Sequence, residues 1–173
     1  MRQLRLQRNL TLQAVADLTG LSPSLLSLVE RGKTSPSIGT LIAVSHALGV
    51  HMGDLVPGNP PPGGAPVLRA SDQRKFSTLQ GIVRTILRDD RKRGLEIAIE
   101  EYSPDSRSAD NKLHHGGYEY GMILEGTLTV DLGGESYDLE TGDSIAYDST
   151  LPHRVINRTD TPVRALWVNL DRS

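Results

Sequence analysis

A ten-residue stretch made almost entirely of proline and glycine divides the chain. It reads PGNPPPGGAP and covers residues 57–66. Proline lacks the amide hydrogen that helices and sheets require, and glycine loses more freedom than other residues when it is fixed in either. We therefore expect an irregular linker here, with one domain at residues 1–56 and a second domain at residues 67–173.

The segment before the linker has the apolar spacing of short helices, with leucines and valines recurring every three or four residues. Side chains suited to capping a helix start occur at Thr11, Ser22 and Ser37, and glycines suited to ending one occur at Gly20 and Gly49. We predict a bundle of five short helices over residues 1–56.

The segment after the linker is different in texture. It contains short runs of β-branched or alternating residues, such as LEIAIEEY and VRALWVNL, separated by turns such as Gly133-Gly134 and Thr141-Gly142. Many short strands with close turns indicate a small all-β sandwich or barrel. The expected fold class of the whole chain is therefore α+β, with a helical domain followed by an all-β domain.

Composition narrows the possible functions. The chain has no cysteine, which excludes disulfides and thiolate metal sites, and it has no apolar run long enough to span a bilayer. The formal net charge is −2, but residues 1–56 carry five basic and three acidic side chains. A locally basic segment in an acidic chain suggests contact with an anion. We expect a cytoplasmic protein with no membrane partner.

The stretch LTLQAVADLTGLSPSLLSLVERGKTSP predicts a helix, a short turn at Gly20 and a second helix that begins at Pro23. In a helix-turn-helix, the second helix enters the major groove of DNA by its N-terminal residues. Residues 1–56 resemble the phage-repressor or XRE family. The resemblance implies phosphate contacts by Ser22 and Lys33, and it implies a buried ion pair between Arg5 and Glu30. By the same resemblance, bases are read by Pro23, Ser24, Ser27 and Leu28. A helical interaction bundle that binds no DNA is the alternative.

Two histidine-containing motifs stand out in the second domain. His115 and Glu119 are four residues apart, as are His153 and Asn157, and even separations on a strand place side chains on one face. These stretches resemble the paired motifs of the cupin barrel, a double-stranded β-helix. In that family the first motif begins with a further histidine, two residues before the one matched by His115, and here that position is Leu113.

The three remaining positions suggest a metal site. The resemblance leaves His115, Glu119 and His153 as ligands, and two histidines with one carboxylate suit one divalent transition metal such as Zn²⁺, Fe²⁺, Mn²⁺ or Ni²⁺. His114 is expected to point to the opposite face of its strand. A pocket that is hydrogen-bonded without metal is the alternative, and Arg84, Arg154, Arg158 and Arg164 are expected on solvated strand faces.

Together the two halves resemble the XRE–cupin class of transcription regulators. That resemblance implies a homodimer or higher oligomer that binds double-stranded operator DNA, with a barrel that senses a small-molecule effector, a metal, or both. It implies no catalytic residues and no enzyme activity. Two alternatives stay open: a metal-dependent cupin isomerase or dioxygenase with a helical appendage, and a regulator whose barrel only dimerises.

Overall fold

The computed structural model describes residues 1–50, 52–55, 66–90 and 93–170. The expected linker falls almost entirely outside the described residues. No single helix among the described residues is long and apolar enough to cross a membrane.

The helical domain contains four α-helices within the described residues, so the prediction of five was wrong. They are α1 (Arg2–Gln7), α2 (Leu12–Thr19), α3 (Pro23–Glu30) and α4 (Ile38–Leu48). After α4, Gly49 adopts the left-handed conformation (φ 57°), and only a three-residue 3-10 turn, Met52–Asp54, follows. So short a segment cannot offset the cost of nucleating an α-helix.

The helix boundaries follow from the capping residues. Thr11 accepts a hydrogen bond from the Ala14 amide at 3.0 Å, and Ser22 accepts one from the Leu25 amide at 3.2 Å. Ser37 caps α4 in the same way. These side chains satisfy amide groups that have no partner within the first turn of a helix.

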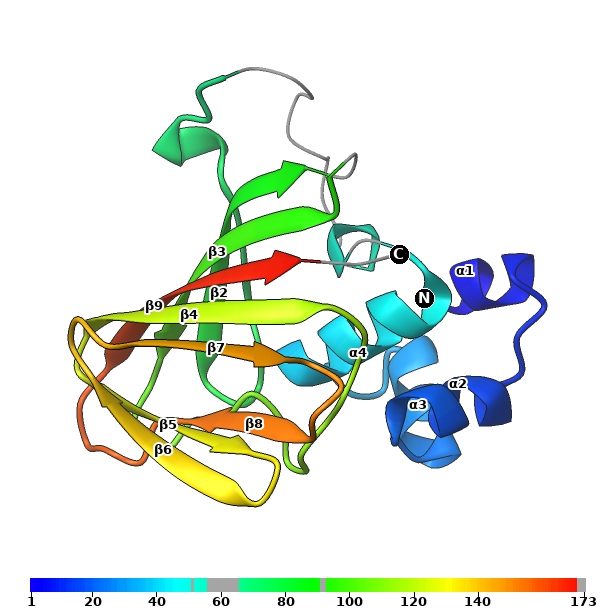
Figure 1. Cartoon of the computed structure of the whole chain (residues 1–173). Coiled ribbons are helices and arrows are strands. Elements are labelled where there is room, and N and C mark those ends of the chain that lie inside the picture. Colours follow the sequence, from blue (N-terminus) through cyan, green and yellow to red (C-terminus); the bar gives the residue numbers. More distant parts are fainter. Residues whose placement is uncertain (51, 56–65, 91–92, 171–173) are drawn as a thin grey trace.

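The second domain consists of two antiparallel sheets that enclose an apolar core (Figure 1). The strands are β1 (Arg74–Ser77), β2 (Ile82–Asp90), β3 (Leu95–Tyr102), β4 (Tyr118–Glu125), β5 (Thr127–Leu132), β6 (Glu135–Glu140), β7 (Ser144–Asp148), β8 (His153–Ile156) and β9 (Val163–Leu170). The larger sheet has the order β1-β2-β3-β9-β4-β7, and the smaller has the order β6-β5-β8. The all-β prediction for this domain is confirmed, although β1 was not expected.

The helical domain, hereafter the head, packs directly on one end of the barrel. Figure 1 shows α4 lying across that end. Ile38 and Ile42 of α4 belong to the same buried cluster as the barrel residues Ile82 and Trp167. The backbone amide of Gly39 donates a hydrogen bond to the Ser108 carbonyl of the barrel at 3.0 Å. The head and the barrel are therefore joined through a shared apolar cluster at α4, while the rest of the head packs on a core of its own.

Candidate metal centre and nucleic-acid interface

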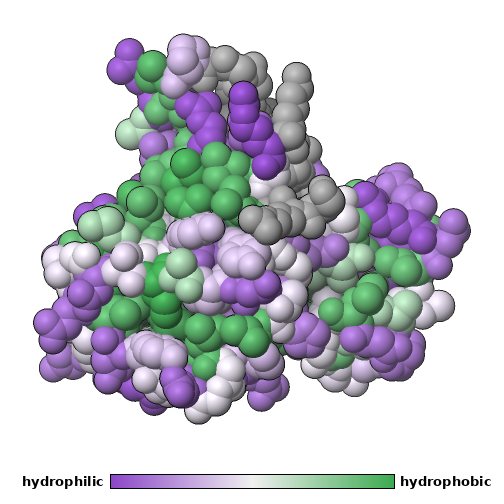
Figure 2. Space-filling view, in the orientation of Figure 1, coloured by the Kyte–Doolittle hydropathy of each residue, from purple (hydrophilic) through white to green (hydrophobic). Residues whose placement is uncertain are grey.

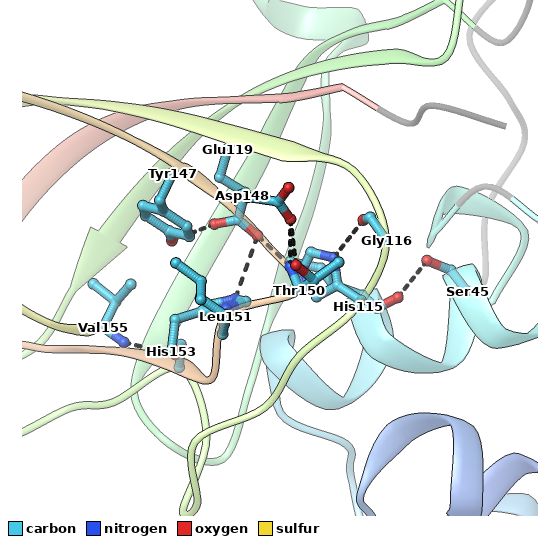
Figure 3. Close-up of polar contacts among 12 residues, drawn as sticks. Ser45, His115, Gly116, Glu119, Tyr147, Asp148, Thr150, Leu151, His153 and Val155 are labelled. Carbon is cyan, nitrogen blue, oxygen red and sulfur yellow. Dashed lines mark hydrogen bonds and ion pairs between the residues drawn. The ribbon is translucent and has the colours of Figure 1, made fainter. Parts of the chain in front are cut away.

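Three side chains from separate segments meet inside the barrel, next to α4 (Figure 3). Glu119 comes from β4, His153 begins β8, and His115 lies just before β4. Glu119 Oε1 is 3.0 Å from His115 Nε2 and 3.6 Å from His153 Nε2. All three residues are buried. The structure thus brings together the three residues that the sequence motifs singled out.

Hydrogen bonds fix the orientation of each of these groups. The Nδ1 atom of His115 lies 2.9 Å from the Gly116 carbonyl, and that of His153 lies 2.8 Å from the Leu151 carbonyl. A carbonyl only accepts, so each Nδ1 is the donor, and each neutral ring presents an unprotonated Nε2 to the cavity. Tyr147 donates to the outer oxygen of Glu119, Oε2, at 2.5 Å. Partners of this kind orient the ligands of protein metal sites.

The electrostatics of the cluster favour a cation between its members. Burial alone would raise the pKa of Glu119, but the facing His115 and His153 outweigh burial and hold that pKa well below its usual value. Burial would also lower the pKa of His153, yet Glu119 more than offsets it and the pKa of His153 is raised. An ionised carboxylate that faces two imidazoles attracts either protons or a metal ion.

The donor set fits a transition metal ion. His115 Nε2 and Glu119 Oε1 are buried and have no properly aligned hydrogen-bond partner among the described residues. Donor atoms bound to one ion at about 2.1 Å lie at most about 4.2 Å apart. The separations of 3.0 and 3.6 Å satisfy that limit, and all three donors lie within 4.8 Å of one another. Two imidazoles and a carboxylate could therefore bind a metal here after small adjustments.

The two residues beside this set face the head. Leu113 is buried against Ala43 of α4 and Ala109. Its backbone pairs with that of His153. An aliphatic side chain therefore lies beside the candidate metal site, at the position where the cupin motif has a histidine. His114 lies close to the α2–α3 turn, because a Cβ atom on Gly20 would be 3.7 Å from its Nε2.

A buried charged cluster, which the sequence reasoning missed, lines the same cavity. Arg84 was expected on a solvated strand face, but it is only 1% exposed and forms ion pairs with Glu96 and Glu100 on β3. Tyr102 donates a hydrogen bond to Glu100. Burial would lower the pKa of Arg84, but the two carboxylates outweigh it and raise that pKa. Arg84 lies two residues from both Ile82 and Ile86 on β2, and all three are buried. Side chains two apart on a strand share a face, so this spacing could have shown that Arg84 points inward.

The six residues implicated in DNA contact lie on and around α3. Ser24 and Leu28 are exposed on this helix, Lys33 is exposed just after it, and Ser22 caps its first turn. Pro23 and Ser27 are half-buried. The other face of α3 is fixed by Leu26, which is fully buried. The helix therefore presents one face to the core and the other to solvent.

The implied ion pair between the first and third helices is present. Arg5 donates two hydrogen bonds to the Glu30 carboxylate, at 2.8 and 2.9 Å. A third hydrogen bond from Arg5 reaches the Leu10 carbonyl at 2.8 Å. A guanidinium held by two parallel bonds sets a defined geometry, so this pair fixes α1 against α3.

Comparisons with known proteins identify both domains. Residues 1–55 match a family model described as a helix-turn-helix, and residues 98–169 match one described as a cupin domain. The HTH-type transcriptional regulator PuuR of Escherichia coli K12 is 28% identical over 156 residues, which are 90% of this chain and 84% of PuuR. The chain is an XRE-type helix-turn-helix regulator with a C-terminal cupin domain. The regulator SutR of the same organism is 23% identical, over 88% of this chain and 82% of SutR.

Two solved structures share the fold of this XRE–cupin regulator. An HTH_3 family transcriptional regulator from Vibrio cholerae superimposes with a TM-score of 0.75 at 25% identity, over 99% of this chain and 93% of that one. Hydroxypropylphosphonic acid epoxidase from S. wedmorenis superimposes with a TM-score of 0.54 at 22% identity, over 98% and 94%. At that identity the epoxidase supports the fold alone. The same architecture thus occurs in regulators and in an enzyme.

Proposed function

We propose that this regulator binds operator DNA through α3 and that a divalent metal ion on His115, Glu119 and His153 sets the strength of that binding. The observation that carries the proposal is the position of α4. This helix packs in the core of the head through Val44 and Leu48, and it lines the metal cavity through Ile38 and Ile42. One rigid element therefore touches both the DNA-binding domain and the sensing site.

A ligand shifts an equilibrium only if it binds two states with different affinity. Here α4 supplies a physical route for that difference. His46 of α4 stacks on His115 with ring centroids 4.5 Å apart and an interplanar angle of 19°. Drawing His115 towards a metal changes its contact with α4. The contact between α4 and the barrel, and with it the position of the head, then differs between the metal-free and the metal-loaded protein.

The test begins with selection of a binding duplex from random DNA by the purified protein. Its affinity is then measured after removal of metal with a chelator and after addition of Zn²⁺, Fe²⁺, Mn²⁺ or Ni²⁺ singly. We expect at least one ion to change operator affinity by about 5–150-fold, the usual range for coupling between sites. His115→Ala should abolish the change and keep DNA binding, whereas His114→Ala should retain both.

Two outcomes would contradict separate parts of the proposal. If no duplex is enriched, DNA binding through α3 is wrong. If the selected duplex binds equally well with every ion and with none, the metal has no regulatory role. The experiment thereby separates the regulator from a protein whose barrel only dimerises.

We further propose that the regulator is a homodimer formed through the outer face of the large sheet. Tyr120 and Met122 are each 43% exposed, and Leu124 is 37% exposed. Their neighbours across the register are Val168 and Leu166. Apolar side chains thus continue from β4 to β9, and Figure 2 shows a hydrophobic area over this sheet. Contiguous apolar surface of this kind marks interaction sites, and a two-fold pairing would bury it symmetrically.

The small volume of the barrel cavity argues against the alternative of a cupin enzyme. The cavity beside the candidate metal site measures about 30 Å³. One water needs at least about 10–15 Å³ of such space, so an ion with one or two waters fills it. We propose that the barrel catalyses no reaction on an organic substrate. Turnover of any substrate by the iron-loaded protein would contradict this.

A further inference from the structure

The barrel cavity is closed by the head. Ile38, Gly39 and Ile42 of α4 line it, and a Cβ atom on Gly39 would lie 3.1 Å from the Leu113 side chain and 3.2 Å from that of Ala109. The backbone of α4 at Gly39 thus packs directly against the barrel wall, and no side chain would fit between them. An organic effector inside the barrel would have to pull α4 out of the shared core. The space for such an effector must be elsewhere.

A much larger space lies between the head and the barrel. It is a cleft of about 310 Å³, and its walls are residues 20–22, residues 34–37 and residues 109–111, with Gln80 of the barrel at one side. Pockets for small organic molecules measure about 300–1,000 Å³ and occur preferentially at domain interfaces. The cleft meets both criteria, and the barrel cavity does not.

The chemistry of the cleft restricts its occupant. Hydroxyl and amide side chains dominate the wall, Asp110 adds a carboxylate, and the described lining residues include no lysine, arginine or histidine. Gln80 Oε1 is buried and has no hydrogen-bond partner among the described residues, so it lacks a donor. The Asp110 carboxylate is already engaged, because Arg107 donates a hydrogen bond to its Oδ1 atom at 3.0 Å. Leu21, Leu25 and Leu113 supply a small apolar floor.

We propose that the effector of this regulator binds in this cleft, and that it is a small polar molecule that donates hydrogen bonds. The proposal rests on the proposed function, because it presumes that the protein regulates DNA. The cleft is well placed for control. Ser22, which caps the DNA-reading helix α3, lines it, and Leu113 lines both the cleft and the metal cavity.

The absence of cysteine from the sequence allows a direct test. Asn111→Cys places one thiol in the cleft, and Ser77→Cys places a matched one on the exposed face of β1. Each variant is treated with a hydroxyethyl methanethiosulfonate, which attaches a small neutral group that ends in a hydroxyl.

The measurement is operator affinity after complete labelling with this group, verified by mass spectrometry. We expect a change of about 5–150-fold for the label at residue 111 and none for the label at residue 77. Ser35→Cys, on the opposite wall of the cleft, repeats the test if Asn111→Cys fails to fold. An unchanged operator affinity after labelling in the cleft would overturn the proposal. Failure of the unlabelled wild-type protein to bind its selected duplex would instead overturn the proposed function.

Discussion

At the scale of single residues, the candidate metal site depends on groups that bind no metal themselves. Two backbone carbonyls direct the Nδ1 protons of His115 and His153, and Tyr147 holds one oxygen of Glu119. Without these partners the imidazoles could present a protonated nitrogen to the ion, and the carboxylate could turn away. The geometry of the three donors is therefore set by the surrounding hydrogen bonds.

Replacing Tyr147 with phenylalanine should weaken metal binding without changing the three donors. The ring stays, so the core keeps its packing, while Glu119 loses the hydrogen bond that fixes it. Loss of such a partner typically costs about 10–100-fold in metal affinity. Competition with a chromophoric chelator measures it. Tyr137→Phe, which removes a surface hydroxyl, is the matched control and should leave the affinity unchanged.

The sequence pointed to the three candidate ligands, which the structure brings together, and missed the groups around them. His115, Glu119 and His153 carry regular spacing within recognisable motifs, so they could be found without coordinates. Tyr147 belongs to β7 and meets Glu119 only because β4 and β7 pair in one register, with these two residues opposite each other. Such a contact depends on tertiary structure, which local pattern does not specify.

At the scale of elements, α3 is a helix whose start, end and exposed face are all locally determined. Ser22 caps it, Pro23 occupies its first position, and Arg31 ends it. These features lie within a few residues of the helix, which is why its bounds were predictable from sequence. The fifth helix and β1 were predicted wrongly or missed because their short segments carry little periodicity.

Substitution at the exposed start of α3 should separate base reading from phosphate contact. Ser24→Glu should abolish binding to the selected operator, because a carboxylate would face phosphates and base acceptors. A glutamate in the first turn favours the helix dipole, so the fold should survive. Lys33→Ala should weaken binding to all duplexes alike and reduce the salt slope by about one unit.

Fluorescence anisotropy over a range of salt concentrations measures both effects. Ser71→Glu, on the exposed surface of the barrel, adds the same charge away from α3 and should bind as the wild type does. An unchanged operator affinity for Ser24→Glu would show that α3 does not enter the groove as proposed.

At the scale of the whole molecule, the head and the barrel form one body through α4. The sequence divided the chain into a helical and a strand segment but gave no sign that they pack together. Ile38 and Ile42 read as ordinary core positions of a helix, and only the structure shows that the barrel is what they pack against. Long-range contacts of this kind bring together residues without a shared local pattern.

We expect tight operator binding to require the proposed dimer. A single head offers one reading helix, whereas two heads about 34 Å apart can engage successive turns of DNA. Met122→Glu places a charge in the middle of the exposed apolar face, where burial against a second copy would leave it unpaired. The variant should be monomeric by analytical ultracentrifugation. It should also lose about 10²–10⁴-fold in affinity for a duplex with two half-sites, the usual gain from joining two binding events.

Binding of the same variant to a single half-site should be unchanged, because α3 and Lys33 are untouched. Leu79→Glu is the control, since Leu79 is 75% exposed and lies outside the β4 and β9 face. It should remain dimeric and bind the full operator normally. A dimeric Met122→Glu protein would place the interface elsewhere. A monomeric variant that still held both half-sites at wild-type affinity would show that the regulator does not need two linked heads.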